Sequence, residues 1–391
     1  MKILMICNTD GALYVFRKPI IKAALAAGHD VVGISGESEY VERLRALGVR
    51  MHVVDFSRHS VGIFDNFRLF LRLLQLIRVE QPDVVHGFTH KPAIYGTLAA
   101  WLAGIKRVHV TITGLGTLFI RDDLKSRILR KLLLWQYFIA LRCANWIYFQ
   151  NSDDLEYFTS LGVVKVERSV LTHGSGIDLS EYPFPSDNEC HVARHSIELE
   201  LGENLESKRI VLLPARGVRE KGFFEFYEAA RIINDLEPQR YVFMHLGLID
   251  SASSCGIPAG DVAEFARKCG VRYLGFKDDI DRYFRGSDIV ALPSYREGTP
   301  RSLIEALALG KCIITTDVPG CRETVLAGWN GYLCTVSSSS SLAASLLRAE
   351  DDFILKARTR ARKLCETKYD VRRLVDLTLR KYLDIDHSNF Y

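Results

Sequence analysis

Short apolar runs alternate with amphipathic, helix-like patterns from the first residues of the chain. In the first part of the sequence the helix-like patterns lie near residues 18–27, 40–47 and 64–79. The apolar runs are rich in β-branched residues and cover residues 2–7, 30–35, 51–56, 82–87, 107–113 and 146–151. Strands that alternate with helices of this length pair in parallel through right-handed crossovers. The pattern therefore predicts a doubly wound α/β sheet.

The alternation lapses near residues 182–200 and then begins again. In the second part the apolar runs cover residues 209–215, 241–247, 271–276, 288–294, 312–317 and 331–334, with a helix-like pattern near 223–234. We interpret the lapse as a linker and the serine run at 337–341 as a loop. The sequence thus predicts two Rossmann-like domains, residues 1–183 and 184–368, on either side of a cleft, followed by a helical segment in residues 369–391. Ligands of such sheets bind at the carboxyl ends of the strands.

Composition narrows the class of protein. The 391 residues, 48% of them hydrophobic, suit two domains, and the net charge of +4 is spread without a long basic run, which argues against a nucleic-acid partner. Nine cysteines without a Cys-x-x-Cys pair are typical of reduced thiols in a cytosol. The N-terminus is typical of a buried strand rather than a signal peptide, and no window is apolar enough to span a membrane. We therefore expect a soluble or peripheral protein.

Two carboxylates flank the start of one predicted helix in "SYREGTPRSLIEALALG", residues 294–310. With Thr299 as N-cap and Pro300 as first helical residue, Glu297 lies in the preceding loop and Glu305 inside the helix. The helix N-terminus beside Gly298 suits a hydroxyl-rich or anionic ligand, with both carboxylates as acceptors for sugar hydroxyls. Two solvated glutamates are the structural alternative.

A diphosphate needs cations, and "PARGVREKGFFEF" supplies them at a strand-to-helix turn. Arg216 can act as a bidentate fork and Lys221 as a point charge. Arg219 could also serve, and the alternative is a solvated basic loop. Two glycine turns follow predicted strands in the first domain, one at Gly11 and one at Gly114 and Gly116. Neither has the GxGxxG spacing, so ordinary loop turns explain them equally well.

Arg216, Lys221, Glu297 and Glu305, in this order and spacing, resemble the retaining nucleotide-sugar glycosyltransferases of family 4, which have the GT-B fold. The resemblance covers nearly the whole chain. The segment "EGTPRSLIEALALGKCIITTDVPGCRE" matches the family's Glu-x7-Glu segment almost residue for residue. The segments "FRKPIIKAALAAGHDV", "FTHKPAIYGTLAA" and "TITGLGTLFI" look like the bacterial subgroup that extends sugars on undecaprenyl diphosphate, including N-acetylgalactosaminyl and hexosyl transferases.

The resemblance implies a role for each of these residues. Arg216 and Lys221 hold the donor diphosphate and assist its departure, Glu297 contacts the donor sugar, and Glu305 binds the ribose. The other residues assigned to donor binding are Gly11, Gly298, Thr299, Arg301 and Phe276, the last beside the uracil. The residues assigned to the acceptor are His90, Lys91, Thr113 and Gly114. Many members carry a histidine where this chain has Thr113, so a catalytic histidine there is in doubt.

The resemblance also implies a reaction, its partners and a location. A hexose or N-acetylhexosamine, with N-acetylgalactosamine as first choice, would move with retention from a UDP-sugar to a polyprenyl-diphosphate-linked saccharide. The C-terminal helix would return to the N-terminal domain. The cations replace a metal, so no metal or other cofactor is expected, and residues 278–281, "DDID", are interpreted as acids at a helix start. His86, His109 and His173 are interpreted as structural.

The basic and apolar segment 118–142 has the composition of a helix that lies on an anionic membrane surface. A buried core helix explains its apolar side equally well. With a lipid-linked acceptor, the segment predicts a cytoplasmic protein on the inner face of the inner membrane. Two other functions remain open, a sugar-nucleotide epimerase of the same fold and a non-catalytic sugar-nucleotide-binding scaffold.

Overall fold

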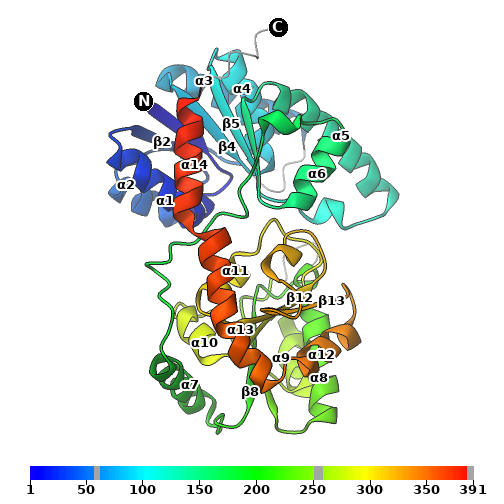
Figure 1. Ribbon diagram of the computed structural model, residues 1–391. Coiled ribbons are helices and arrows are strands. Elements are labelled where there is room, and N and C mark those ends of the chain that lie inside the picture. The colour runs from blue at the N-terminus through cyan, green and yellow to red at the C-terminus, as the bar shows by residue number, and fades with distance from the viewer. Residues whose placement is uncertain (57–61, 251–258, 385–391) are drawn as a thin grey trace. The chain divides into compact units, whose positions relative to one another are not determined.

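The computed structural model describes residues 1–56, 62–250 and 259–384. The chain divides into two compact units, each built on its own parallel sheet (Figure 1). The first unit contains Met1–Gly176 and the C-terminal segment from Val371, and the second contains Ile177–Asp370. The cleft predicted between the two domains stays a prediction.

The first unit contains a seven-stranded sheet in the order β3-β2-β1-β4-β5-β6-β7. The strands are β1 (Lys2–Ile6), β2 (Asp30–Ser35), β3 (Arg50–Val53), β4 (Val84–Phe88), β5 (Arg107–Ile112), β6 (Trp146–Phe149) and β7 (Ser169–Leu171). The helices that accompany them are α1 (Asp10–Ala26), α2 (Tyr40–Ala46), α3 (Ile63–Glu80), α4 (Thr97–Leu102), α5 (Leu124–Arg142) and α6 (Ser152–Ser160). Strands β1 and β4 are buried almost throughout, as expected for parallel strands covered on both faces.

The second unit contains a six-stranded parallel sheet in the order β10-β9-β8-β11-β12-β13. The strands are β8 (Arg209–Pro214), β9 (Tyr241–Leu246), β10 (Val271–Gly275), β11 (Ile289–Leu292), β12 (Cys312–Thr316) and β13 (Gly331–Cys334). The helices are α7 (Asp187–Leu201), α8 (Phe223–Leu236), α9 (Ala259–Cys269), α10 (Ile280–Gly286), α11 (Arg301–Ala308), α12 (Ser339–Arg348) and α13 (Asp351–Leu364). In both sheets the strand order reverses direction next to the first strand, which is the doubly wound arrangement that the sequence predicts.

The last helix, α14 (Val371–Leu383), packs against the first unit, where it lies beside α1 in Figure 1. Its Tyr382 is completely buried, and the Tyr382 hydroxyl lies 2.7 Å from His86 Nδ1. The other ring nitrogen of His86 lies 2.7 Å from Thr111 Oγ1, so both nitrogens have a partner. Burial lowers the pKa of His86 well below its usual value, which keeps the ring neutral. His86 therefore serves to attach the C-terminal helix to the sheet.

Four local predictions need correction. Residues 187–201 form helix α7 rather than a linker, and its N-terminus carries a capping box between Ser186 and Glu189. The last three residues of the serine run open α12, with Ser338 as N-cap. Helix α1 begins at Asp10 with Thr9 as N-cap, so Gly11 lies in its first turn rather than in a loop. Helix α11 begins at Arg301, one residue later than predicted.

The boundaries of the units also differ from the predicted ones. The first unit ends at Gly176 rather than at residue 183, because Ile177 is buried in the second core and its amide donates to the carbonyl of Tyr369. The chain returns to the first unit at Val371 rather than at residue 369, since Tyr369 is also buried in the second core.

Candidate active site

The central residues of the predicted donor site meet at the point where the second sheet reverses its strand order. Strand β8 pairs with β9 on one side and β11 on the other. The connections that follow β8 and β11 therefore leave the carboxyl edge of the sheet in different directions, which is where open α/β sheets bind ligands. Lys221 follows β8 and Glu297 follows β11, and their side chains form an ion pair in which Lys221 Nζ lies 2.5 Å from Glu297 Oε1.

The Lys221–Glu297 pair is partly enclosed and held by its surroundings. The side chains of Lys221 and Glu297 are 27% and 13% exposed. Ser294 Oγ lies 2.7 Å from the same carboxylate oxygen of Glu297. The backbone amide of Tyr295 donates to the Glu220 carbonyl at 2.8 Å, which joins the loop after β11 to the loop after β8. The pair is thus a preformed group of one cation and one anion at the edge of the sheet.

Two glycines with positive φ make this close packing of loops possible. A Cβ on Gly222, which has φ +74°, would lie 2.1 Å from the Pro293 carbonyl oxygen. A Cβ on Gly320, which has φ +78°, would lie 2.6 Å from the Glu297 carbonyl oxygen and 2.4 Å from that of Gly298. A larger residue at either position would push the loop that carries Glu297 away from its place.

Arg216 and Arg219, which the sequence could not rank, have different surroundings. Arg216 is 58% exposed at its side chain, and its Nη1 lies 2.8 Å from Asp250 Oδ2. The guanidinium of Arg219 lies over the ring of Phe224, with 5.0 Å between Cζ and the ring centroid. Arg216 is therefore an accessible cation in an ion pair that a diphosphate can replace, whereas Arg219 covers an aromatic ring.

Glu305 is fixed by two donors, one of which the sequence did not reveal. Its Oε1 accepts from Arg301 Nε at 2.9 Å and from the Tyr182 hydroxyl at 3.0 Å. Burial, and then the charge of Glu305, raise the pKa of Tyr182 to about 12, so the phenol stays protonated and remains a donor. Arg301, which was assigned to donor binding, orients the carboxylate in this structure.

The other predicted donor residues lie around this group or in the first unit. Phe276 follows β10 with 62% of its surface exposed, which leaves its ring available for stacking. The hydroxyl of Thr299 donates to the Gly298 carbonyl at 2.9 Å rather than capping the helix, and Pro300 is the N-cap with extended backbone. Gly11 belongs to the first unit, where a Cβ on it would lie 3.2 Å from the Tyr40 ring.

The predicted acceptor residues are only partly brought together in the first unit. Thr113 and Gly114 follow β5, and a Cβ on Gly116 in the same turn would lie 3.6 Å from His90 Nε2. The other nitrogen of His90, Nδ1, lies 2.6 Å from the Tyr137 hydroxyl. Burial lowers the pKa of His90 to about 4, so its ring is neutral near pH 7.

Lys91 has different surroundings from its neighbour. It lines a pocket of about 460 Å³ together with Asp55, Asp65, Arg68 and others. Burial lowers the pKa of Lys91, against the two nearby aspartates, which raise it. His90 therefore contacts Tyr137, whereas Lys91 faces the pocket with the two aspartates.

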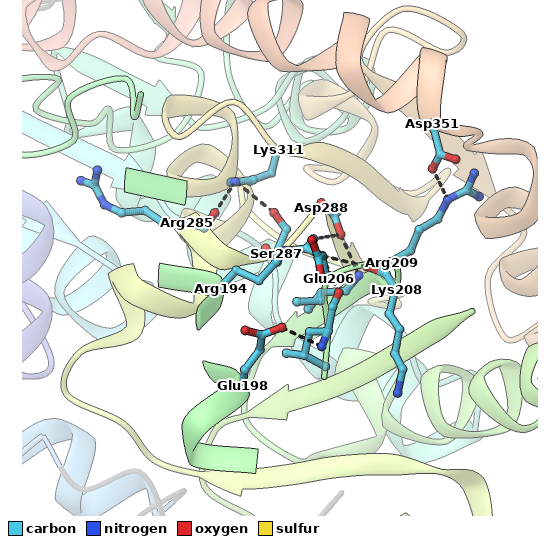
Figure 2. Close-up of polar contacts among 12 residues, drawn as sticks. Arg194, Glu198, Glu206, Lys208, Arg209, Arg285, Ser287, Asp288, Lys311 and Asp351 are labelled. Carbon is cyan, nitrogen blue, oxygen red and sulfur yellow. Dashed lines mark hydrogen bonds and ion pairs between the residues drawn. The ribbon is translucent and has the colours of Figure 1, made fainter. Parts of the chain in front are cut away.

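A second cavity, of about 630 Å³, lies at the amino edge of the second sheet. Figure 2 shows polar contacts among residues of this region. The cavity is lined by residues at the amino ends of β8, β11 and β12, and none of the predicted site residues lies in it. Its cations have partners: Arg194 lies 2.5 Å from Asp288, and Arg209 lies 2.6 Å from Asp351. Lys311 is 5% exposed and donates to the carbonyls of Arg285 and Ser287 at 2.8 and 3.0 Å. This lysine caps the end of α10.

Lys311 predicts a pH dependence of stability. Burial lowers its pKa from 10.5 to about 8. Below pH 8 the folded and unfolded chains both carry the charge, and folding bears the full cost of burying it. Above pH 10.5 neither chain carries it. At about 1.4 kcal/mol per pKa unit, the free energy of unfolding should rise on the order of 3 kcal/mol across this window, relative to Lys311→Met.

Denaturant unfolding of both proteins from pH 7 to 11 measures this difference. Lys356→Met is the matched control, because Lys356 is 57% exposed in an ion pair on α13. If the free energies of unfolding of the wild type and Lys311→Met differed by the same amount at every pH in this range, Lys311 would have an ordinary pKa, which would contradict the prediction.

Two profiles of known protein families match the chain. The profile of the glycosyl transferases group 1 matches residues 200–364, and that of the glycosyl transferase 4-like family matches residues 2–151. These two matches, together with a relative that is 31% identical over 90% of this chain, show that the protein belongs to the glycosyltransferases.

The alignments with two curated relatives cover both halves of the chain. The chain is 31% identical over 354 residues to the N,N'-diacetylbacillosaminyl-diphospho-undecaprenol alpha-1,3-N-acetylgalactosaminyltransferase of Campylobacter jejuni, covering 90% of each chain. It is 25% identical over 344 residues to the UDP-Gal:alpha-D-GlcNAc-diphosphoundecaprenol alpha-1,3-galactosyltransferase of Escherichia coli, covering 86% of this chain and 84% of that one.

Solved structures agree on the fold. HepE of Anabaena, solved in complex with UDP-glucose, matches with a TM-score of 0.76 at 18% identity over 97% of this chain and 99% of that chain. Sucrose-phosphate synthase of Thermosynechococcus elongatus matches with a TM-score of 0.76 at 16% identity over 98% of each. These likenesses confirm the predicted GT-B fold with its two Rossmann-like units.

Proposed function

We propose that this glycosyltransferase moves a hexose or N-acetylhexosamine, with N-acetylgalactosamine as first choice, from a UDP-sugar to a polyprenyl-diphosphate-linked saccharide with retention at the anomeric carbon. The observation that carries the proposal is the Lys221–Glu297 pair at the reversal point of the second sheet, with Arg216 and Glu305 in the same unit. The names of the two curated relatives support the lipid-diphosphate acceptor and the choice of sugar.

The charges of the site suit departure of a diphosphate. Lys221 and Arg216 can each exchange a carboxylate partner for phosphate oxygens, which neutralises charge as the sugar–phosphate bond breaks. Glu297, once Lys221 turns to the phosphate, can accept hydrogen bonds from the hydroxyls of the donor sugar. Glu305, held by Arg301 and Tyr182, can accept from the ribose hydroxyls.

Retention follows if leaving group and nucleophile share one face of the sugar. The anomeric C–O bond to the diphosphate breaks and the bond to the acceptor oxygen forms on that face. The acceptor hydroxyl gives its proton to a phosphate oxygen of the departing diphosphate. In this scheme the protein supplies charge and orientation, and Lys221 and Arg216 take the place of a metal ion. Within the part of the chain that the structure describes, no group of three or more His, Cys, Asp or Glu residues is placed to hold a metal.

A panel of UDP-sugars with a synthetic polyprenyl diphosphate saccharide tests the proposal, with EDTA present. Transfer of one sugar, with a product of the donor's anomeric configuration, is the expected result. Conversion of the donor to an isomer without acceptor would identify an epimerase, and binding without turnover would identify a scaffold. Either outcome contradicts the proposed reaction.

We also propose that α5 holds the protein on the cytoplasmic surface of the inner membrane. Its exposed apolar side chains are Leu124, Ile128, Leu132, Trp135 and Ile139, which are 74%, 59%, 49%, 60% and 37% exposed. Their spacing of three and four residues places them along one face of the helix, which we call the α5 apolar stripe. The exposed Lys125 and Lys131 lie on the same helix, whereas Arg127 is paired with Asp122. No described helix is long and apolar enough to cross a membrane.

If the α5 apolar stripe contacts the membrane, the double substitution Ile128→Asp with Leu132→Asp should weaken binding to anionic vesicles. Each change removes apolar surface that would be buried in the membrane, at about 1.5–3 kcal/mol for a fully buried side chain. We expect binding to anionic vesicles to fall at least about tenfold, and added salt to weaken binding of the wild type.

The matched control carries Leu199→Asp and Leu355→Asp, because these leucines are 73% and 68% exposed but lie on other helices. Its vesicle binding should equal that of the wild type. Equal cosedimentation of all three proteins, or no preference for anionic over neutral vesicles, would exclude α5 as the membrane surface.

A further inference from the structure

Arg17 lies where an apolar residue would be expected. It belongs to the buried face of α1, between Leu13 on one side and Ile20 and Ile21 on the other, and it is 4% exposed. Its guanidinium lies over the ring of Phe88, with 4.4 Å between Cζ and the ring centroid. Among the described residues we find no carboxylate or carbonyl that pairs with it. The chain therefore keeps in an apolar environment a cation that contacts an aromatic ring but, among the described residues, pairs with no anion.

A buried charged group without an anionic partner destabilises the folded protein, so its presence needs an explanation. A buried charge is normally paired or hydrogen-bonded, because its desolvation is otherwise not offset. Burial lowers the pKa of Arg17 to about 10, which still leaves it charged near pH 7. Arg17 is 4% exposed, and among the described residues we find no hydrogen bond from its nitrogens, so the guanidinium keeps its capacity to donate to an anion.

The place of Arg17 in the sheet points to a ligand. Its neighbour Phe88 ends β4, and Cys7, whose thiol is close enough to interact with it, follows β1. Strands β1 and β4 pair with Ile6 opposite Gly87, and they are the strands between which the order of the first sheet reverses. Arg17 thus lies at the carboxyl edge and reversal point of its sheet, where open α/β sheets bind ligands.

Other polar groups at this edge also lack partners. Asn8 Oδ1 and Thr89 Oγ1 are enclosed without a hydrogen bond. Thr89 has a φ of 72°, a strained conformation for a β-branched residue. Buried polar atoms without partners and backbone strain both occur more often at ligand sites than elsewhere. Two such groups, one after each of two adjacent strands, together with Arg17 on α1, indicate a site that is completed by a ligand.

We propose that Arg17 binds a phosphate group of the acceptor's diphosphate, with Asn8 and Thr89 as neighbours for the adjoining phosphate and sugar oxygens. A guanidinium presents a planar fork that matches two oxygens of one phosphate. The Thr89 hydroxyl can donate to a further oxygen, and Asn8 Oδ1 can accept from a sugar hydroxyl. This inference rests on the proposed function, because it takes the lipid-linked diphosphate as the ligand of the first unit.

Kinetics of Arg17→Leu test the site, since leucine suits the buried face of α1. We expect the KM for the lipid-linked acceptor to rise about 10- to 50-fold, with the KM for the UDP-sugar unchanged. Arg17→Lys should recover part of the loss because it keeps the charge. Arg45→Leu, which removes an exposed arginine paired with Glu42 on α2, is the control and should match the wild type. A rise in the KM for the UDP-sugar, or an unchanged acceptor KM, would overturn the proposal.

Binding of inorganic pyrophosphate tests the Arg17 phosphate site independently of whether the protein transfers a sugar. The titration uses Lys221→Met, in which the second unit has lost a donor-site cation, with and without Arg17→Leu. Pyrophosphate should raise the melting temperature of Lys221→Met, and the rise should become clearly smaller when Arg17→Leu is added, because only the contribution of Arg216 then remains. This result would support the site even if no transfer were found. Equal protection of both proteins would exclude Arg17 as the phosphate ligand, even if the wild type proved to be an active transferase.

Discussion

Lys221→Met is expected to lower the turnover number of sugar transfer by about 10²- to 10³-fold, the range observed when one preorganised donor to a developing anion is removed. The methionine keeps much of the length and apolar volume of the lysine but removes the cation that would face the departing diphosphate. In the free protein this cation lies 2.5 Å from Glu297. Steady-state kinetics with saturating donor and acceptor measure the effect.

The design of this experiment separates catalysis from folding. Lys356→Met is the matched control, because it removes an exposed lysine from an ion pair on the surface of α13. Circular dichroism and the melting temperature should show that both variants are folded. A Lys221→Met enzyme that keeps a tenth or more of the wild-type turnover number would show that Lys221 does not assist the leaving group.

Gly320→Ala is expected to reduce activity about 10²-fold, because a displacement of about 1 Å at a reacting group has an effect of this size. Its Cβ would lie 2.4 Å from the Gly298 carbonyl oxygen and 2.6 Å from that of Glu297, so the loop with Glu297 must move. We expect a loss of about 2–5 kcal/mol in the free energy of unfolding, from the clash and the strain of an alanine at positive φ.

Gly328→Ala is a closely matched control for this clash. Gly328 has φ +74°, close to the +78° of Gly320, but no atom lies within 4 Å of its Cβ position. It should therefore show only the cost of the backbone conformation, about 1–2 kcal/mol, with normal activity. Denaturant unfolding and initial rates on both variants give the comparison. If the two substitutions lowered the free energy of unfolding and the initial rate equally, the close packing of Gly320 against the Glu297 loop would contribute nothing to stability or activity.

Each charged residue that we assign to the donor has an ion-pair partner in this structure. Lys221 is paired with Glu297, Arg216 with Asp250, and Glu305 with Arg301. A diphosphate must therefore compete with Glu297 and Asp250 for its cations. The pairing keeps the side chains in place without a ligand, and the exchange of partners releases Glu297 for the sugar hydroxyls. In the proposed function, binding of the donor thus couples recognition of the phosphates to recognition of the sugar.

Most strands could be predicted from the sequence because parallel strands buried on both faces form continuous apolar runs. The structure confirms this for β1, β4 and β8. Helix α7 was missed because its polar composition resembles a linker, although Ser186 and Glu189 form a capping box that marks its start. Helix α1 was predicted to begin too late because Gly11 suggested a turn. Pro19, which usually interrupts a helix, lies inside it.

The candidate site could be predicted only as far as local motifs extend. Beyond them, only the family resemblance indicated that Arg216, Lys221, Glu297 and Glu305 belong to one donor site, and the structure shows the contact between Lys221 and Glu297. The sequence could not predict the contact between Tyr182 and Glu305, because these residues are 123 positions apart and no pattern links them. Arg17 appeared in a segment shared with the family, but its lack of a partner becomes visible only when the packing of α1 on the sheet is known.

A crystal structure of the wild-type protein with UDP tests the proposed donor site. We expect the diphosphate within hydrogen-bond distance of Arg216 and Lys221, and the ribose hydroxyls on the carboxylate of Glu305. A nucleotide bound elsewhere, with Lys221 still paired to Glu297 and Glu305 free of the ribose, would contradict it.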